Sequence, residues 1–436
     1  MRPSPLRIGL LGCGVVGGGL VGLLGSRERA VTEASSGPLR LTRVAVRDPS
    51  KRRDVDLAGV EVGDDPMAVA GADDVDILVE LMGGLEEALP AVRRALERGI
   101  PVITANKLLM SAHGPELESL AAAKGVELRH EASVGAVIPI LQSLDQGLRT
   151  ERCTLLVGIL NGTTNFILST MEREHRDFSE ALDAARTLGF AEADPSLDLS
   201  GADTAQKMTL LARRAFRAEV PHGSIPTEGI VGMEPEDLRD AERFGYVVKL
   251  LGIGQRLPEG LDLRVHPAFI PKRYLLAAVR DEFNAVYLRG EAAGSMLLYG
   301  KGAGALPTAQ AVLGDLLAVA RERRLREANG ASAIAAPARP ANDPEPRLHL
   351  DDVRTKVYLR LTVEDQAGVL AQITQRLGAA GVSVAQMFQE PCARGEASIT
   401  LLTHKARDRD VRDAVAAIAA LPAVRRAPRS IRIFDR

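Results

Sequence analysis

Aromatic and cysteine residues are scarce in this chain of 436 residues. Only 3% of the residues are aromatic and none is tryptophan, which argues against stacking surfaces for nucleic-acid bases or sugars. The three cysteines, Cys13, Cys153 and Cys392, lie far apart and match neither a zinc pattern nor a disulfide framework. This cysteine usage favours a reducing cytoplasm.

A large excess of charge is also missing. The formal net charge is −2, which predicts no binding face for nucleic acid or an acidic membrane. One uncharged run, residues 8–25, follows two arginines in the manner of a signal peptide, but eight of its 18 residues are glycine. Glycine is poor in a long hydrophobic helix, and the following SRER offers no cleavage site. We therefore interpret the run as a strand, a turn and the start of a helix that continues to about Ala34.

The N-terminal part of the chain alternates short apolar runs with helical patterns. Such alternation predicts an α/β fold with a Rossmann-type, doubly wound parallel sheet. The runs expected as strands are 6–11, 39–46, 75–82, 101–106 and 127–134.

A glycine motif, Gly12-x-Gly14-x-x-Gly17, stands between the first expected strand and a helix. Gly12 permits a tight turn, Gly14 lets backbone approach a pyrophosphate, and Gly17 lets the helix pack closely on the sheet. Val15 and Val16 open the helix, whose N–H groups would face the phosphates. The motif predicts a dinucleotide site, with a purely structural turn as the alternative.

Charged residues follow the second and fourth expected strands. Arg47 at the end of the second would accommodate the 2′-phosphate of NADP, whereas Asp48 beside it would hold the ribose of NAD. The basic run that follows at 51–53 favours NADP, and a solvated loop is the alternative. Lys107, in the sequence TANK, can reach the nicotinamide side because ligands bind at the carboxyl ends of parallel strands.

Residues 189–207 gather four acids and a lysine. Asp203 and Lys207 are four apart, so a helix places them on one face, and Glu192 and Asp198 lie in a loop that can fold back over it. A buried ammonium group among carboxylates can hold an amino-acid zwitterion and deliver a proton. The alternative is an exposed helix ion pair worth about 0.3–0.5 kcal/mol.

One further segment has both a functional and a purely structural interpretation, and a second has a structural one. Glu131 precedes an expected chain reversal at Gly135, and a carboxylate with successive carbonyl oxygens could ligate a hard cation. The alternative is an ordinary strand end. Asn161 and Thr163 are expected to cap the following helix.

The chain is expected to divide into three domains. Residues 1–140 form the dinucleotide-binding domain, completed by a helix at about 300–329, and 141–299 form an α+β domain for substrate binding and dimerisation. Residues 330–350, rich in alanine and proline, are expected to be a linker. Residues 351–436 follow the βαββαβ order of a ferredoxin-like module.

Six motifs in order resemble homoserine dehydrogenases over about residues 6–325: GCGVVG, TANK, EASVGAVIP, GILNGTTNFIL, GFAEADPSLDLSGADTAQK and YGKGAGALPTA. The tail resembles an ACT domain through EDQAGVLAQITQRLGAAGVSV, and no kinase segment precedes the glycine motif, as in the monofunctional form. The resemblance implies NAD(P)H-dependent reduction of aspartate 4-semialdehyde to homoserine, on the route to threonine, methionine and isoleucine. It further implies a homodimer or homotetramer and threonine as an effector at the ACT domain.

The resemblance also implies roles for single residues. Lys207 would be the proton donor or acceptor, with Asp203 beside it and Lys107 as a second lysine at the substrate and nicotinamide. Substrate contacts would be Gly189, Glu192, Asp198 and Asp203; cofactor contacts would include Arg47 and Gly304; and a sodium ion would bind at Glu131, Val134, Ala136 and Ile138. The chain departs from the family at Val137, where glycine is usual and where a β-branched residue disfavours a positive φ.

Two other functions fit the same modules. One is a different Rossmann amino-acid dehydrogenase, for example one that acts on aspartate. The other is a ligand-sensing regulator in which both modules only bind. The lysine–acid cluster argues against pure sensing, because sensing needs no proton donor beside a nicotinamide.

Overall fold

The computed structural model describes residues 3–328, 345–392 and 395–435. Contacts between residues divide the chain into two units: unit 1 is Met1–Arg152, Gln206–Ser224 and Leu298–Asp343, and unit 2 is Cys153–Ala205, Ile225–Leu297 and Pro344–Arg436. Most of the expected linker, up to residue 344, lies outside the described residues.

Unit 1 is built on a six-stranded sheet in which every neighbouring pair is parallel, in the order β3-β2-β1-β4-β5-β6. This order is that of dinucleotide-binding doubly wound sheets, so the predicted α/β fold is confirmed. The strands are β1 (Leu6–Leu11), β2 (Leu39–Ala45), β3 (Glu61–Gly63), β4 (Ile77–Glu80), β5 (Val102–Thr104) and β6 (Leu128–Arg129).

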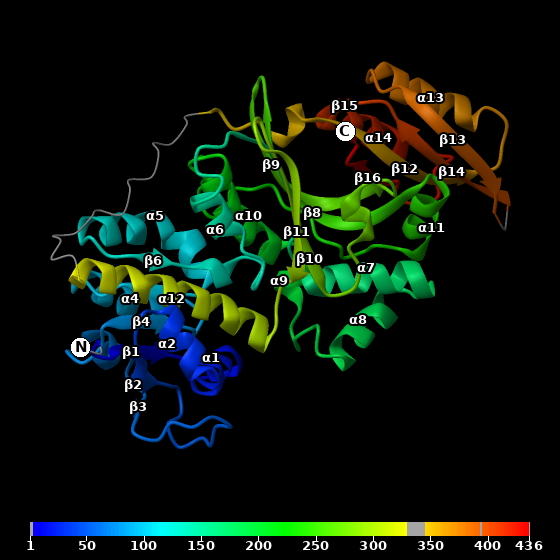
Figure 1. Cartoon of the computed structure of the whole chain (residues 1–436). Helices are drawn as coiled ribbons and strands as arrows, with labels where there is room; N and C mark the ends of the chain where they lie inside the picture. Colours follow the sequence, from blue (N-terminus) through cyan, green and yellow to red (C-terminus); the bar gives the residue numbers. More distant parts are fainter. Residues whose placement is uncertain (1–2, 329–344, 393–394, 436) are drawn as a thin grey trace. The chain divides into compact units, whose positions relative to one another are not determined.

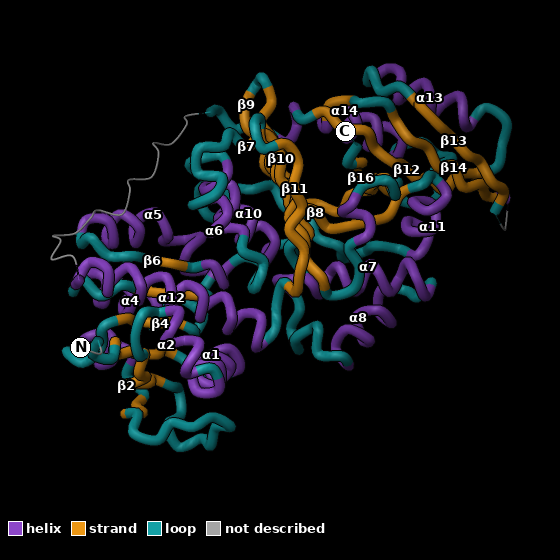
Figure 2. Tube along the Cα trace, viewed as in Figure 1, coloured by secondary structure: helices purple, strands orange, loops and turns teal. Residues whose placement is uncertain are grey.

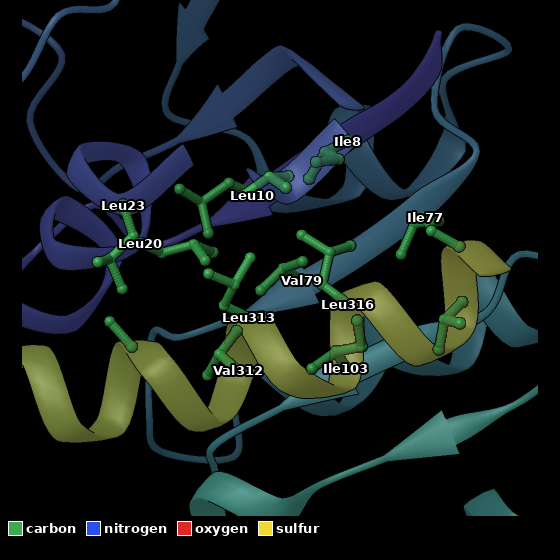
Figure 3. Close-up of a cluster of buried hydrophobic side chains, with 14 of the residues drawn as sticks. Ile8, Leu10, Leu20, Leu23, Ile77, Val79, Ile103, Val312, Leu313 and Leu316 are labelled. Atoms are coloured by element: carbon green, nitrogen blue, oxygen red, sulfur yellow. The ribbon is translucent and has the colours of Figure 1, made fainter. Parts of the chain in front are cut away.

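Helices lie against this sheet. They are α1 (Val15–Ser26), α2 (Glu28–Ala34), α3 (Pro66–Gly71), α4 (Ala88–Glu97), α5 (Lys107–Ala123), α6 (Ile140–Asp145) and α12 (Ala305–Ala328). Figure 3 shows α12 with Leu313 and Leu316 directed at side chains from the central strands, among them Val79. A segment far along the sequence thereby supplies part of the hydrophobic core of unit 1.

Two elements of unit 1 differ from expectation. The helix expected to run to Ala34 is interrupted at Arg27, which separates α1 from α2. The strand expected at 127–134 shortens to β6 and becomes a 3-10 helix, Glu131–Ser133. The backbone leaves the sheet there because the Glu131 N–H donates to Asp315 on α12 at 2.9 Å instead of to a neighbouring strand.

Unit 2 contains most of a second, ten-stranded mixed sheet in the order β11-β10-β7-β8-β9-β16-β12-β14-β13, with β15 paired to β12 alone. Its first five strands in sequence are β7 (Cys153–Ile159), β8 (Tyr246–Leu257), β9 (Gly260–Pro271), β10 (Phe283–Gly290) and β11 (Gly294–Lys301). The helices of this part are α7 (Gly162–Glu174), α8 (Phe178–Thr187), α9 (Ser196–Leu199), α10 (Ala202–Ala215) and α11 (Pro235–Arg243). The division between the two units falls inside α10, after Ala205.

The C-terminal part of unit 2 has the predicted ferredoxin-like order. Its elements are β12 (Arg354–Glu364), α13 (Val369–Ala379), β13 (Val384–Pro391), β14 (Glu396–Thr403), β15 (Ala406–Arg407), α14 (Asp408–Ala419) and β16 (Arg429–Ile433). Figure 1 shows α13 and α14 beside the strands of this module. Side chains of the two helices join those of β12 and β14 in one buried cluster.

This C-terminal module does not form a separate sheet. Strand β16 pairs in parallel with β9, with Arg432 opposite Ala268 and Ile433 opposite Phe269. The strands of the module, drawn in orange in Figure 2, therefore continue the sheet of β7–β11. No helix in the described part of the chain is both long and apolar enough to cross a membrane.

Candidate functional site

The glycine turn after β1 has the geometry that its motif predicts. Gly12 has a φ of +91°, and a Cβ there would lie 2.7 Å from the Leu81 carbonyl oxygen. A Cβ on Gly17 would lie 2.2 Å from the Gly12 oxygen, so both positions require glycine. Nothing lies within 4 Å of a Cβ built on Gly14, and Val15 at the start of α1 is exposed. An open backbone at a helix N-terminus fits a pyrophosphate group.

At the end of β2, the acid and the arginine have different environments. Asp48 accepts hydrogen bonds from the Ser50 hydroxyl (2.6 Å) and the Ser50 N–H (2.9 Å), which hold its pKa below the usual range. Arg53 donates to the Asp48 carbonyl oxygen at 2.8 Å. Asp48 therefore shapes its own loop, whereas Arg47 has an exposed side chain on the same edge.

Glu80 is an ionisable group of this edge that the sequence analysis missed. It ends β4, is fully buried, and accepts hydrogen bonds from the N–H groups of Met82 (2.8 Å) and Gly83 (3.1 Å) and from the Thr104 hydroxyl (2.5 Å). Burial raises the pKa of Glu80. An acid that ends an apolar strand and precedes two glycines was the available sequence signal.

The TANK segment joins β5 to α5. Asn106 caps α5 by accepting from the Leu109 N–H (3.0 Å), and its amide donates to the Gly84 carbonyl oxygen (2.7 Å). Lys107 is the first residue of α5 and is half-buried. The loops that follow β4 and β5 are thus tied together beside this lysine.

In unit 2 the structure brings Asp198 and Asp203 together at Asn161. The Asn161 amide donates to Asp198 (2.7 Å) and to Asp203 (2.9 Å). The Thr163 hydroxyl oxygen lies 3.0 Å from Asp198 and 2.7 Å from the Phe190 carbonyl oxygen. The segment before α10 therefore does fold back, and its Asp198 shares one polar cluster with Asp203 of α10.

Asn161 also caps α7, as predicted, by accepting from the Thr164 N–H at 2.8 Å. The same prediction is wrong for Thr163. Its hydroxyl contacts the Phe190 carbonyl and Asp198, because residue 163 already lies inside the helix.

Asp203 and Lys207 lie one turn apart on α10, as the spacing predicts. Asp203 is 4% exposed and Lys207 is 9% exposed, so the alternative of an exposed ion pair is wrong. The same helix buries Met208, Leu211 and Ala212 completely. A charged pair on a buried helix face can act on a bound molecule in a way that a solvated pair cannot.

Glu192 is more exposed than Asp198 and Asp203. It is exposed, as is Asp194, whose carboxylate accepts from the Ser196 N–H at 3.1 Å. Glu192 is thus on the surface of the loop that carries Asp198 inward.

Two glycines predicted as site residues have left-handed backbone. Gly189 has a φ of +76° and ends α8: its N–H donates to Arg186 and the next N–H to Ala185. That pattern is a Schellman motif, which glycine favours. Gly304 has a φ of +117° directly before α12. Both positions require glycine for the turn itself.

The expected cation loop reverses at Gly135. Both oxygens of the Glu131 carboxylate accept N–H groups at the start of α6, from Leu141 (2.9 Å) and Gln142 (2.6 Å). Burial, together with Asp315, raises the pKa of Glu131 to about 7. Val134, Ala136 and Ile138 are buried. The described residues contain no group of three or more His, Cys, Asp or Glu side chains suited to a metal, so an ion here would depend on carbonyl oxygens.

Val137 is not strained by its position in this loop. The left-handed residues are Gly135 (φ +69°) and Ala136 (φ +46°), whereas Val137 is outside that region and 40% exposed. The β-branched side chain at position 137 is therefore compatible with the backbone of this loop.

Family models match nearly the whole chain. The model described as homoserine dehydrogenase matches residues 139–317, and the one described as homoserine dehydrogenase, NAD binding domain, matches residues 12–131. An ACT domain model matches residues 357–423.

Curated relatives and solved structures agree with these matches. The homoserine dehydrogenase of Bacillus subtilis is 38% identical over 94% of this chain and 93% of its own, and that of Neisseria gonorrhoeae is 37% identical over 99% of each. The crystal structure of a homoserine dehydrogenase from Thiobacillus denitrificans is 40% identical, with a TM-score of 0.92 over 99% of each chain.

Proposed function

The chain belongs to the homoserine dehydrogenase family, oxidoreductases that act on a CH–OH group, and from that premise we propose how its residues carry the reaction. The substrate pair is L-aspartate 4-semialdehyde and L-homoserine, and Lys207 is the acid–base group. One observation carries the proposal: α10 holds Asp203 and Lys207 buried and one turn apart.

In the direction of reduction, Lys207 donates a proton to the alkoxide oxygen as negative charge develops on it; in the reverse direction it accepts that proton. Asp203, one turn away on α10, orients the lysine. Asp198 and Asp203, held by Asn161, bind the ammonium group of the substrate. A nicotinamide cofactor bound at the glycine turn supplies the hydride, and Lys107 borders it from the start of α5.

Lys207→Met tests the assignment. Loss of one acid–base group is expected to lower kcat by about 10²–10⁴-fold with little change in the KM for homoserine. The control is Lys124→Met, which removes an exposed lysine after α5 and is expected to leave kcat unchanged. Near-normal turnover by Lys207→Met would end the assignment.

The proposed cofactor is NADP, with NAD as the second choice. Arg47 is exposed on the edge where the 2′-phosphate binds, and the carboxylate of Asp48 is engaged by Ser50. Arg47→Ala is expected to lower kcat/KM for NADPH about 10-fold and to leave that for NADH unchanged. Equal effects on both cofactors would contradict the role of Arg47.

Threonine is the proposed effector of the ACT domain. A hollow of about 350 Å³ is lined by the turn between β12 and α13 and by Gln389 of β13, and its size and polar lining suit a small amino acid. Gln389→Ala is expected to weaken inhibition by threonine, whereas Gln386→Ala, three residues away on β13, is not. If threonine leaves the unsubstituted enzyme unaffected, this effector is wrong.

Three further properties are proposed. Sodium binds at the loop of Glu131, Val134, Ala136 and Ile138, which activity titrations with Na⁺ against K⁺ would test. The chain forms a homodimer or homotetramer, which light scattering would measure. It works in the reducing cytoplasm, a proposal supported by three cysteines that lie far apart in the sequence and match no disulfide framework.

A further inference from the structure

Lys249, on β8, is a buried cation that the proposed reaction does not use. Its side chain is fully buried, and Nζ donates to Asn165 Oδ1 at 2.9 Å and lies 3.5 Å from Ser169 Oγ. None of the ion pairs found among the described residues includes Lys249. Burial lowers its pKa to about 8; the charged groups that face it are Glu172 on α7, and Arg280 and Asp281 before β10.

Such a lysine is costly to the folded state. A buried charge without an ion-pair partner loses its hydration and regains only part of it through neutral hydrogen bonds. An apolar side chain of similar size is often as stable or more stable at such a position. Residues that reduce stability in this way are typical of functional sites. We therefore expect Lys249 to contribute to function.

Lys249 contacts one polar stripe on α7. Asn161, Asn165 and Ser169 are spaced by four, so they occupy one face of the helix at successive turns, and all three are buried. Asn161 holds the acids Asp198 and Asp203. Asn165 and Ser169 are also hydrogen-bonded to the backbone before and at the start of β10. Asn165 donates to the Phe283 carbonyl oxygen at 3.0 Å, and Ser169 Oγ accepts from the Asp281 N–H at 3.2 Å.

We propose that charged Lys249 is a positioning residue for the substrate: through Asn165 and Ser169 it fixes the rotation and height of α7, and thereby the place of Asn161 and its two acids. The inference deepens the proposed function, in which these acids bind the substrate's ammonium group. Misplacement of a binding group by about 1 Å can cost up to 10²-fold, so the effect of Lys249 is on substrate binding.

Lys249→Met keeps an unbranched side chain, shorter by one atom, and removes its charge. The KM for homoserine is expected to rise about 10-fold, with kcat within about 3-fold and the KM for NADPH unchanged. The matched control is Lys272→Met, an exposed lysine paired with Glu242, which leaves all three constants unchanged. An unaltered KM for homoserine in Lys249→Met overturns the proposal.

Thermal unfolding separates positioning from a structural role. At pH 7 the Met variant is expected to unfold at the same temperature as the unsubstituted chain or higher. The pKa of Lys249 in the folded chain is below its ordinary value of 10.5. The unsubstituted chain therefore gains stability as the pH rises from about 8 to 10.5, and the difference in unfolding temperature between it and the Met variant narrows over that range. A Met variant that unfolds at a lower temperature, or fails to fold, assigns Lys249 to stability and overturns the proposal.

A pH profile tests the charge itself. The ratio of the homoserine KM in the Met variant to that in the unsubstituted chain is expected to fall from about 10 at pH 7 towards 1 above pH 9, as Lys249 loses its proton. The substrate's own amine titrates in the assays of both enzymes, so its effect cancels in the ratio of the two KM values. A ratio that stays constant with pH overturns the proposal. Failure of the proposed function would look different, because the unsubstituted chain would then not oxidise homoserine at all.

Discussion

Asn161 uses both ends of its side-chain amide. The oxygen caps α7 by accepting the Thr164 N–H, and the nitrogen donates to Asp198 and Asp203. Because the cap needs only an oxygen, the two contributions can be separated by substitution.

Asn161→Ser is expected to preserve the cap and remove the amide donor to the acids. Serine is as good a cap as asparagine, so the unfolding free energy should change by less than about 1 kcal/mol while the KM for homoserine rises about 10-fold. The control is Asp177→Ser, which exchanges the cap of α8 and should leave the kinetics unchanged. Steady-state kinetics and urea unfolding measure the two effects, and equal KM values for the two variants would contradict the role of Asn161.

Glu80 has a comparable role at the sheet edge of unit 1. Glu80→Ala leaves the N–H groups of Met82 and Gly83 and the Thr104 hydroxyl without their acceptor. Each buried unpaired group costs about 1–3 kcal/mol, so we expect a lower midpoint of thermal unfolding and a weaker affinity for NADPH. Glu86→Ala, an exposed acid in the same loop, is the control, and similar behaviour of both variants would argue against this role of Glu80.

For single residues, the features that could be predicted from the sequence are those that depend on neighbours along the chain. The cap at Asn161 and the spacing of Asp203 and Lys207 follow from positions three or four residues apart. The acids that Asn161 binds are 37 and 42 residues away along the chain, and no local pattern announces them. The hydrogen bond from Thr104 to Glu80 is also not local, since Thr104 comes from another strand.

Among the elements, α5 contains a proline in its interior, and α10 compensates for it. Pro115 has no N–H, so the Ser111 carbonyl lacks its intrahelical donor. Arg213 of α10 donates to that oxygen at 2.8 Å and to the Met110 oxygen at 3.0 Å. The helices that begin with Lys107 and carry Lys207 are thereby joined through one guanidinium.

Arg213→Met is expected to leave the Ser111 carbonyl group without a donor. The unfolding free energy should fall by about 1–3 kcal/mol, and kcat should fall more than the KM for homoserine, because the two lysines lose their fixed spacing. Arg186→Met, on the exposed face of α8, should alter neither. A loss of stability with unchanged kcat would limit Arg213 to a structural role.

On the scale of the whole molecule, the C-terminal module is joined to the rest of unit 2 by charge as well as by strand pairing. Asp237 of α11 is fully buried, and burial raises its pKa. Arg360 of β12 lies 2.9 Å from its carboxylate, and Arg429 of β16 lies 3.1 Å from it. Removing the module would take both arginines away from Asp237.

Deletion of residues 345–436 is therefore expected to damage the enzyme beyond the loss of regulation. Breaking a buried ion pair costs about 3–5 kcal/mol, and the edge of β9 would be open to other chains. Size-exclusion chromatography should show aggregation. Arg360→Met, which leaves Arg429 in place, should keep the enzyme monodisperse with a lower unfolding midpoint. A stable, fully active truncated chain would contradict the coupling.

The βαββαβ order of the module could be predicted because each strand and helix has its own local pattern. The pairing of β16 with β9 could not, since its register covers two residues on strands far apart in sequence. The sequence suggests separable modules, whereas the structure joins them in one sheet.

Because β16 lies near the C-terminal end of the chain, it is synthesised long after β9, the strand with which it pairs. Strand β9 leaves the ribosome on the order of ten seconds before β16 at roughly 5–20 residues per second. Throughout that interval the edge of β9 at Ala268 and Phe269 lacks the strand that later pairs with it, so the nascent chain exposes backbone N–H and C=O groups that other chains can also bind. Slower translation of the C-terminal module should thus lower the yield of native enzyme, because it prolongs this exposure.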